Sequence, residues 1–325
     1  MNPEHLFPRR RFLLPCLALL VLASPATRAA SVPPGAIATA ATPAAKARFE
    51  APTPVGQVSV PGEVEELVPG GAVDWSGMTV RARGAGVLDP GNPDRNQAWQ
   101  TAEQAAVTVA QRNLLEIVKG LRVDSDNRLQ DLMAEHDTVS WLVGAIVKGA
   151  RPGGPATYDS TGGTVEVELE CDLYGAVGIE NALTSLPAAD TPAGAADTGE
   201  VSDSSQDFLR RYSGLVLDGA NTALKPSLSP KIYDESGNLL LDLRDCLTNP
   251  DVSGNYVVQY VAKLEQVLSR PDFARPPLVL KVKGVRGKLG TDIVLGKTDA
   301  DKVMSFKNAI QFLVGTGRVL VRLAM

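Results

Sequence analysis

The sequence predicts an α+β protein of two small domains, and three patterns indicate this. Residues 98–121 place apolar side chains at helical spacing, which is typical of an amphipathic helix. Residues 164–173 alternate strictly between apolar and acidic side chains, which is typical of a strand with one buried face. Residues 188–206 have a linker composition and precede a second set of strand and helix patterns. We expect the first domain to be a long helix packed on an antiparallel sheet of at least three strands.

At 325 residues the chain is long enough for two domains with separate cores, and 44% hydrophobic with 21% charged residues is ordinary globular composition. We divide the chain into five segments by composition. They are an export signal peptide (1–29), a disordered leader rich in Ala and Pro (30–72), a first α+β domain (73–187), a flexible linker (188–206) and a second α+β domain (207–325).

The N-terminus has the order of an export signal: three arginines at residues 9–11, an apolar core over residues 12–22, then small residues. Cleavage is expected after Ala29 or Ala26, so that the mature protein leaves the cytoplasm. General secretion and the twin-arginine route both remain open. The apolar core is too short to span a bilayer, and no transmembrane segment is expected. No lipid anchor is expected either, because Cys16 opens the apolar core instead of following it.

In the first domain, residues 75–87 are predicted to form a strand that Gly84 and Gly86 end or bulge. The long helix is expected to begin at an Asn92-Pro93 cap and to stop at Lys119-Gly120. Its apolar stripe is rich in alanine, and such small side chains allow a helix to approach a sheet closely.

Two further elements are predicted before the acidic strand. Residues 129–133 predict a short helix, and residues 139–150 predict a strand. That strand would pair with residues 164–173 through a long loop rich in Pro and Gly. The long helix would cover one face of this sheet, and the other face would carry the glutamates.

The second domain is also predicted to mix strands and helices. Apolar strands are expected at 214–218, 231–234, 238–243, 278–285, 291–295 and 318–323, with a hairpin between the second and third. Helical spacing predicts helices at 254–268 and 298–313.

The glutamates of the acidic strand are the first candidate site, because carboxylates bind hard cations such as calcium. Same-face residues of one strand lie about 6.5–7 Å apart, which is too far for their oxygens to converge on one ion. We interpret Glu166, Glu168 and Glu170 as a solvated face balanced by cations on neighbouring strands. The candidate cations are Arg81, Arg83, Lys148 and Arg151.

No catalytic, cofactor-binding or metal-ligating residue is expected, and no cofactor. Outside the signal the chain has one histidine, His136, and a lone histidine cannot build a zinc site without partners. We expect it at the end of the short helix. A net charge of -5 argues against a nucleic-acid partner. Cys171 and Cys246 would form a disulfide or remain buried thiols, and the sequence leaves both open.

Residues 98–123 and 143–173 resemble a bacterial envelope family, the twenty-kilodalton outer-membrane lipoproteins and the related N-terminal domain of the flagellar T-ring protein. The residues that carry the resemblance are Ala102, Ala106, Arg112-Asn113-Leu114-Leu115, Gly120, Val123-Asp124, Val147-Lys148-Gly149-Ala150 and Val165-Glu166-Val167. The resemblance covers about residues 98–174 and implies an α+β module of envelope assemblies without catalysis. The chain departs from the family in having no lipobox. Its C-terminal half looks like a recurrent partner domain of uncharacterised secreted bacterial proteins.

From these patterns we expect a non-catalytic exported protein, in the periplasm or at the outer membrane. It would be a binding or scaffold component of an outer-membrane or flagellar-type assembly, with other envelope proteins or its own copies as partners. One alternative is a cell-wall hydrolase, which would need two carboxylates about 5–9.5 Å apart in a cleft. A second alternative is a small-ligand-binding periplasmic protein, for which 5% aromatic residues leaves few stacking platforms.

Overall fold

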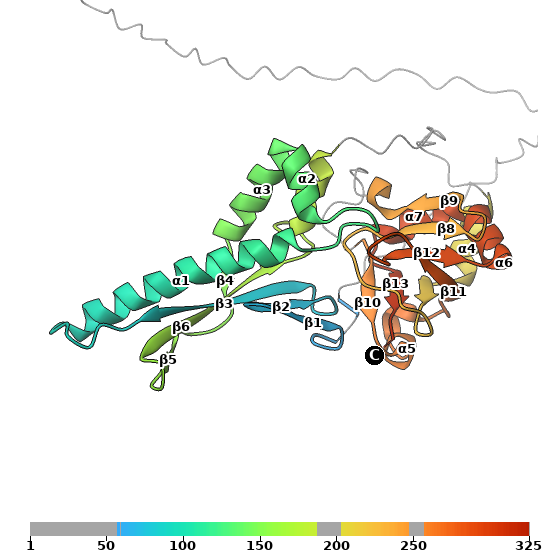
Figure 1. Cartoon of the computed structure of the whole chain (residues 1–325). Helices are drawn as coiled ribbons and strands as arrows, with labels where there is room; N and C mark the ends of the chain where they lie inside the picture. Colours follow the sequence, from blue (N-terminus) through green and yellow to red (C-terminus); the bar gives the residue numbers. More distant parts are fainter. Residues whose placement is uncertain (1–56, 59, 187–202, 247–256, 325) are drawn as a thin grey trace, which may run out of the picture. The chain divides into compact units, whose positions relative to one another are not determined.

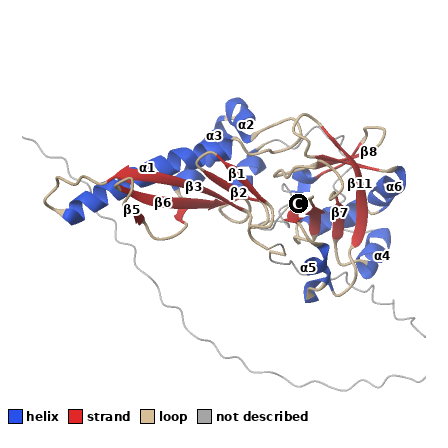
Figure 2. Cartoon of the chain, turned by 60° about the horizontal axis from the view of Figure 1, so that its bottom comes forward, coloured by secondary structure: helices blue, strands red, loops and turns tan. Residues whose placement is uncertain are grey.

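The computed structural model describes residues 57–58, 60–186, 203–246 and 257–324. This part of the chain has an α+β fold with one antiparallel sheet and one mixed sheet (Figures 1 and 2). A long helix packs on the antiparallel sheet, which confirms the predicted fold class. The predicted signal peptide and most of the predicted linker lie outside the described residues.

The first sheet has the strand order β1-β2-β3-β6-β4, and β5 also pairs with β6. Its strands are β1 (Glu65–Val68), β2 (Gly71–Asp74), β3 (Thr79–Val87), β4 (Arg151–Pro152), β5 (Thr157–Asp159) and β6 (Thr164–Asp172). All neighbours are antiparallel. The longest pair is β3 with β6, which runs from Thr79 opposite Asp172 to Val87 opposite Thr164. The alternation of β6 is as predicted, with its valines and leucine buried beneath the long helix.

The long helix is α1 (Arg95–Lys119), which crosses the face of β3 and β6. Its N-cap is Asp94, whose side chain accepts hydrogen bonds from the N–H groups of Asn96 and Gln97. The predicted cap at Asn92 is therefore wrong by two residues, because an aspartate nearer the stripe satisfies the first-turn donors. The helix ends at Gly120, as predicted.

Gly84 and Gly86 do not end or bulge β3, which continues to Val87 with unbroken pairing. A Cβ on Gly84 would lie 2.2 Å from the carbonyl oxygen of Ala106, and a Cβ on Gly86 would lie 1.9 Å from that of Ala102. The glycines are therefore required by the close approach of the α1 backbone. The predicted strand end is wrong because the constraint is tertiary.

Two helices follow α1: α2 (Leu129–Glu135), as predicted, and α3 (Asp137–Lys148). The prediction of a strand at residues 139–150 is wrong. Val139, Val143 and Val147 recur every fourth residue and form the buried face of α3. The many β-branched residues of this segment favour a strand, but its apolar spacing matches a helix. The partner of β6 is consequently β3, and the expected loop instead contains β4 and β5.

The predicted leader does not remain without structure up to residue 72. β1 and β2 form a hairpin across Pro69 and Gly70, and Gly70 has a φ of 83°, a conformation that glycine adopts without strain. Val73 is buried in the same core as α1. The two strands are short and carry acidic residues, so the general Ala and Pro content of the region hid them and the Pro-Gly turn between them.

The second sheet has the order β10-β13-β7-β11-β12-β8-β9. Its strands are β7 (Leu215–Asp218), β8 (Lys231–Asp234), β9 (Leu239–Asp242), β10 (Gln259–Val261), β11 (Leu278–Arg286), β12 (Asp292–Leu295) and β13 (Val319–Arg322). The β11–β12 and β8–β9 pairs are antiparallel and the other pairs are parallel. The α-helices of this part are α4 (Asp203–Arg211), α5 (Leu264–Leu268), α6 (Lys297–Ser305) and α7 (Lys307–Val314).

Three predictions for this half need correction. Residues 254–268 are not one helix, because residues 259–261 form β10 on the edge of the sheet. The helix predicted at 298–313 is broken at Phe306, whose ring packs 4.9 Å from that of Phe208. The predicted linker overlaps α4, which begins at Asp203.

Backbone hydrogen bonds connect the segment after α1 with the second half of the chain. The N–H of Leu228 donates to the carbonyl of Arg122 at 2.9 Å, and that of Ser229 donates to Val123 at 2.8 Å. The Tyr174 hydroxyl donates to the carbonyl of Leu228 at 2.9 Å. Buried apolar residues of both halves belong to one continuous core. The halves are thus joined by more than the covalent chain.

Candidate functional site

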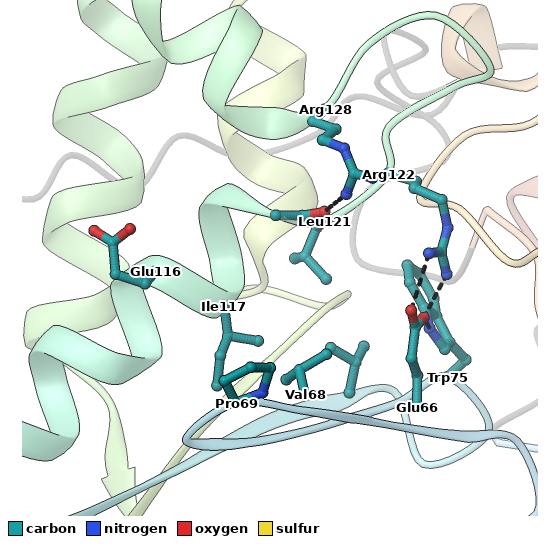
Figure 3. Close-up of a pocket in the computed structure, with 11 residues that line it drawn as sticks. Glu66, Val68, Pro69, Trp75, Glu116, Ile117, Leu121, Arg122 and Arg128 are labelled. Atoms are coloured by element: carbon teal, nitrogen blue, oxygen red, sulfur yellow. Dashed lines mark hydrogen bonds and ion pairs between the residues drawn. The ribbon is translucent and has the colours of Figure 1, made fainter. Parts of the chain in front are cut away.

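A pocket of about 290 Å³ lies between the β1–β2 hairpin and the end of α1 (Figure 3). The hairpin supplies Glu66, Val68, Pro69, Val73 and Trp75. The helix and the segment after it supply Glu116, Ile117, Gly120, Leu121, Arg122 and Arg128. The walls are therefore partly apolar, with charged groups at one side.

The pocket forms where the β1–β2 hairpin turns and α1 ends, because neither element continues to fill the space between them. The hairpin turns at Pro69, and α1 ends at Gly120, whose N–H donates to the carbonyls of Glu116 and Ile117. After Gly120 the chain leaves the helix direction and forms a bridge between Arg122 and Arg128. This turn brings both arginines to the rim of the space beneath the helix end (Figure 3).

An ion pair between a buried arginine and a half-buried glutamate forms the polar wall of the pocket. The Arg122 guanidinium donates to both carboxylate oxygens of Glu66, at 3.1 and 2.5 Å, and lies 5.6 Å from the centre of the Trp75 ring. The Trp75 indole N–H donates to Glu66 at 3.3 Å. The hydrogen bond from Arg122 lowers the pKa of Glu66 below its ordinary value and outweighs desolvation, which acts in the opposite direction. Glu66 is therefore a fixed anion, suited to holding a structure or a cation.

Arg128 is the second arginine of the pocket rim and lies close to Leu121 (Figure 3). Its guanidinium donates to the carbonyl oxygen of Gly120 at 2.7 Å, and within the described part of the chain it makes no ion pair. The other exposed charge of the pocket, Glu116, is bonded to Lys119 at 2.7 Å. Of the charged residues that line the pocket, Arg128 is thus the one whose hydrogen-bond partner carries no charge.

The glutamate row lies on the open face of the first sheet, as predicted. Arg83 donates to Glu168 at 2.8 Å, and Arg151 donates to Glu170 at 2.8 Å. Arg81 lies opposite Glu170 in the pairing register but bonds to Glu65 on β1. Glu166 lies opposite Ala85, and Lys148 belongs to α3 instead of a strand. Two of the three glutamates therefore have the expected kind of partner, and the proposed role of Lys148 is wrong.

Other sequence candidates are structural. Among the residues described, no group of three or more His, Cys, Asp or Glu side chains is placed to hold a metal. His136 lies between α2 and α3 and caps the C-terminal end of α2, the short helix at whose end it was predicted. Cys171 is a free, buried thiol whose pKa desolvation raises to about 12, so it is not a reactive nucleophile. The side chain of Cys246 lies outside the described residues.

Sequence reasoning missed a buried polar cluster between the halves. Lys231 donates to Asp124 at 3.1 Å, and Ser125 donates to Asp292 at 2.6 Å. Desolvation raises the pKa of Asp292 and of nearby Asp242 above their ordinary values. The residues come from segments more than 100 positions apart, so no local spacing could reveal the cluster.

Another buried carboxyl stands apart from the pocket. Glu180, on a 3-10 helix (Ile179–Ser185) after β6, is 4% exposed, and desolvation raises its pKa to about 8. One oxygen accepts from the N–H of Gly175 at 2.7 Å. At neutral pH this carboxyl is mostly protonated.

Part of the chain matches a known protein family. Residues 214–323 match the family model described as the second domain of Treponema pallidum Tp0624. This range contains all seven strands of the second sheet, from β7 to β13. No curated protein matches the chain. None of the helices in the described part of the chain has the length and apolar character needed to cross a bilayer.

Proposed function

We propose that this chain is a non-catalytic exported protein of the bacterial cell envelope, which binds other envelope proteins or further copies of itself. It would serve as a binding or scaffold component of an outer-membrane or flagellar-type assembly. The observation that carries this proposal is the state of the pocket charges. Glu66 is neutralised by Arg122 and has a lowered pKa, so the site offers recognition surfaces in place of a proton donor.

The hydrolase alternative requires a carboxyl acid with a raised pKa facing a second carboxylate across a cleft. In the described part of the chain the carboxyls with raised pKa are Glu180, Asp242 and Asp292, and all three are at most 4% exposed. The pocket carboxylates are Glu66 and Glu116, and both are bonded to cations. These observations favour binding over hydrolysis.

The small-ligand alternative is favoured by one observation, the volume of the pocket. About 290 Å³ is at the lower end of the range for small-molecule sites, and it equally suits a single large side chain of a partner. Calorimetry with small periplasmic metabolites tests this alternative directly.

The resemblance of residues 98–174 to envelope modules supports the same assignment. In the proposed protein this module is followed by a second one, residues 214–323, which matches a Treponema domain and adds no assigned activity. Export is tested by N-terminal sequencing and mass of the processed protein. A mature chain that begins near Ser31 or Thr27 without lipid supports the proposal, and a lipidated Cys16 contradicts the expectation of no lipid anchor.

Binding is tested by cross-linking in the native envelope, followed by capture of the full-length protein. We expect one defined assembly to be recovered. Absence of any envelope partner, together with release of sugar fragments from purified cell wall that Glu66→Gln abolishes, would replace this proposal with the hydrolase.

A further inference from the structure

β1 is an edge strand. Within the described residues, no strand pairs with its outer side. The N–H of Trp75 donates to the carbonyl of Val64 at 2.9 Å, and hydrogen-bonded pairs alternate along an antiparallel ladder. Glu65 and Leu67 therefore direct their backbone N–H and C=O groups away from β2. Such groups are a template for a further strand.

Both charged side chains of β1 are bonded to arginines of the protein itself, and one apolar side chain is exposed. Natural edge strands commonly carry charges or prolines that discourage pairing. Glu65 is engaged by Arg81 across the sheet, whereas Leu67 is 80% exposed. A large apolar side chain in that position gains free energy when a partner covers it.

The pocket lies beside the same edge, on the other face of the sheet. Glu66 and Val68 line it (Figure 3). Leu67 points away because side chains alternate along a strand. Directly opposed residues of paired strands have Cβ atoms about 4.5–5.5 Å apart. An added strand would therefore place an alternate side chain next to Val68, above Ile117 and Leu121. The space suits one large apolar side chain.

The charge at the rim indicates what accompanies that side chain. Arg122 is bonded to Glu66 and Glu116 to Lys119, whereas Arg128 donates to a neutral carbonyl. Arginine presents five N–H donors, so Arg128 has the capacity to bind a carboxylate as well. The complementary occupant carries a negative charge near its apolar side chain.

We propose that β1 is a strand-addition site for an extended segment of a partner protein, with a large apolar side chain for the pocket and a carboxylate for Arg128. This rests on the proposed function and specifies the chemistry of the partner. A second copy of β1 is a poorer occupant. In the register that pairs Glu65 with Leu67, Glu66 would face Glu66 of the other copy, and opposed like charges are destabilising.

The test uses the full-length mature protein and a synthetic nonapeptide of alternating threonine and leucine in which aspartate replaces the last leucine, so that its carboxylate lies on the same face as the remaining leucines. Control peptides carry asparagine in place of aspartate, or proline at the centre. We expect the acidic peptide to bind and to slow hydrogen exchange at the amides of Glu65 and Leu67 at least tenfold. The proline peptide should bind at least tenfold more weakly, because it lacks a ladder donor.

Three variants separate the contributions. Leu67→Asp should lower the affinity for the acidic peptide about tenfold. Leu239→Asp, on the edge strand β9 of the second sheet, should leave that affinity unchanged. Arg128→Gln should lower the affinity for the acidic peptide about tenfold and the affinity for the asparagine peptide much less. Thermal melting of each variant checks that the fold is retained.

The proposal is overturned if the peptides fail to bind at millimolar concentration, or bind without protecting the two amides. It is also overturned if those amides are already protected in the peptide-free protein, either as a monomer or as a concentration-dependent dimer. Recovery of the same envelope partner by wild type and Leu67→Asp would reject strand addition while leaving the proposed function intact.

Discussion

At the scale of single residues, Glu180 is the titratable group with the clearest consequence for stability. Its folded pKa of about 8 exceeds the ordinary value of 4.5, so the folded state retains a proton that the unfolded state releases. The stabilisation is fully present below pH 4.5 and is lost as pH rises through about 8. We expect the free energy of unfolding of wild type to fall over this range.

The Glu180→Gln variant should show a flatter profile and exceed wild type in stability at pH 9. Denaturant unfolding between pH 4 and 9 measures both curves. Parallel curves would show that Glu180 is not the group that titrates.

The Arg122–Glu66 pair is a second test at this scale. Glu66→Ala would leave the guanidinium of Arg122, which is 8% exposed as a residue, without its carboxylate. We expect a loss of about 1–3 kcal/mol in the free energy of unfolding, because a buried charged donor loses its acceptor. Glu116→Ala, at the exposed end of the same pocket, should cost much less. Equal losses would contradict the importance of the Arg122–Glu66 pair.

The glutamate row should contribute little. The pairs of Glu168 and Glu170 are solvent-exposed, and such pairs contribute about 0.2–1 kcal/mol each. A triple Glu166→Gln, Glu168→Gln and Glu170→Gln variant should therefore keep its fold and melt slightly below wild type. Unfolding of this variant, or a melting temperature of wild type that rises with calcium, would reject the interpretation as a solvated face.

At the scale of elements, the contact between α1 and β3 leaves no room for side chains at two positions. Gly86→Ala would place a Cβ 1.9 Å from the carbonyl oxygen of Ala102 and force the helix away from the strand. We expect the free energy of unfolding, measured with denaturant, to fall by about 1–3 kcal/mol.

Gly144 supplies the matched control. It lies inside α3, and a Cβ there would meet nothing within 4 Å. Gly144→Ala should stabilise the protein by up to about 1 kcal/mol, because alanine favours a helix over glycine. Destabilisation by this change would argue that residues 137–148 are not helical.

Elements whose pattern is local were predictable from the sequence, and those set by distant contacts were not. The alternation of β6 and the stripe of α1 each follow from neighbours within one element, so both were predicted with small errors at their ends. The α3 segment was misassigned because its valines satisfy both a strand composition and a helical spacing. The pocket was missed because Glu66 and Arg122 are separated by 56 positions.

At the scale of the whole molecule, the described halves share hydrogen bonds and one apolar core. We therefore expect them to stay together without the covalent connection. A protease site introduced within residues 188–202 and then cut should yield two fragments that co-elute in gel filtration and unfold in one transition. Separation of the fragments at micromolar concentration would show that the shared contacts are too weak to hold the halves.

The glycines beneath α1 also have a mechanical consequence. Where the backbone of a helix rests directly on the backbone of a strand, no long side chains lie between them to deform. With 25 residues, α1 is about 38 Å long, and it lies along β3 from Val87 toward the β1–β2 hairpin. At Gly84 and Gly86 we therefore expect the helix and the strand to move together, so that a force applied at the Val87 end would displace both elements instead of deforming the contact between them.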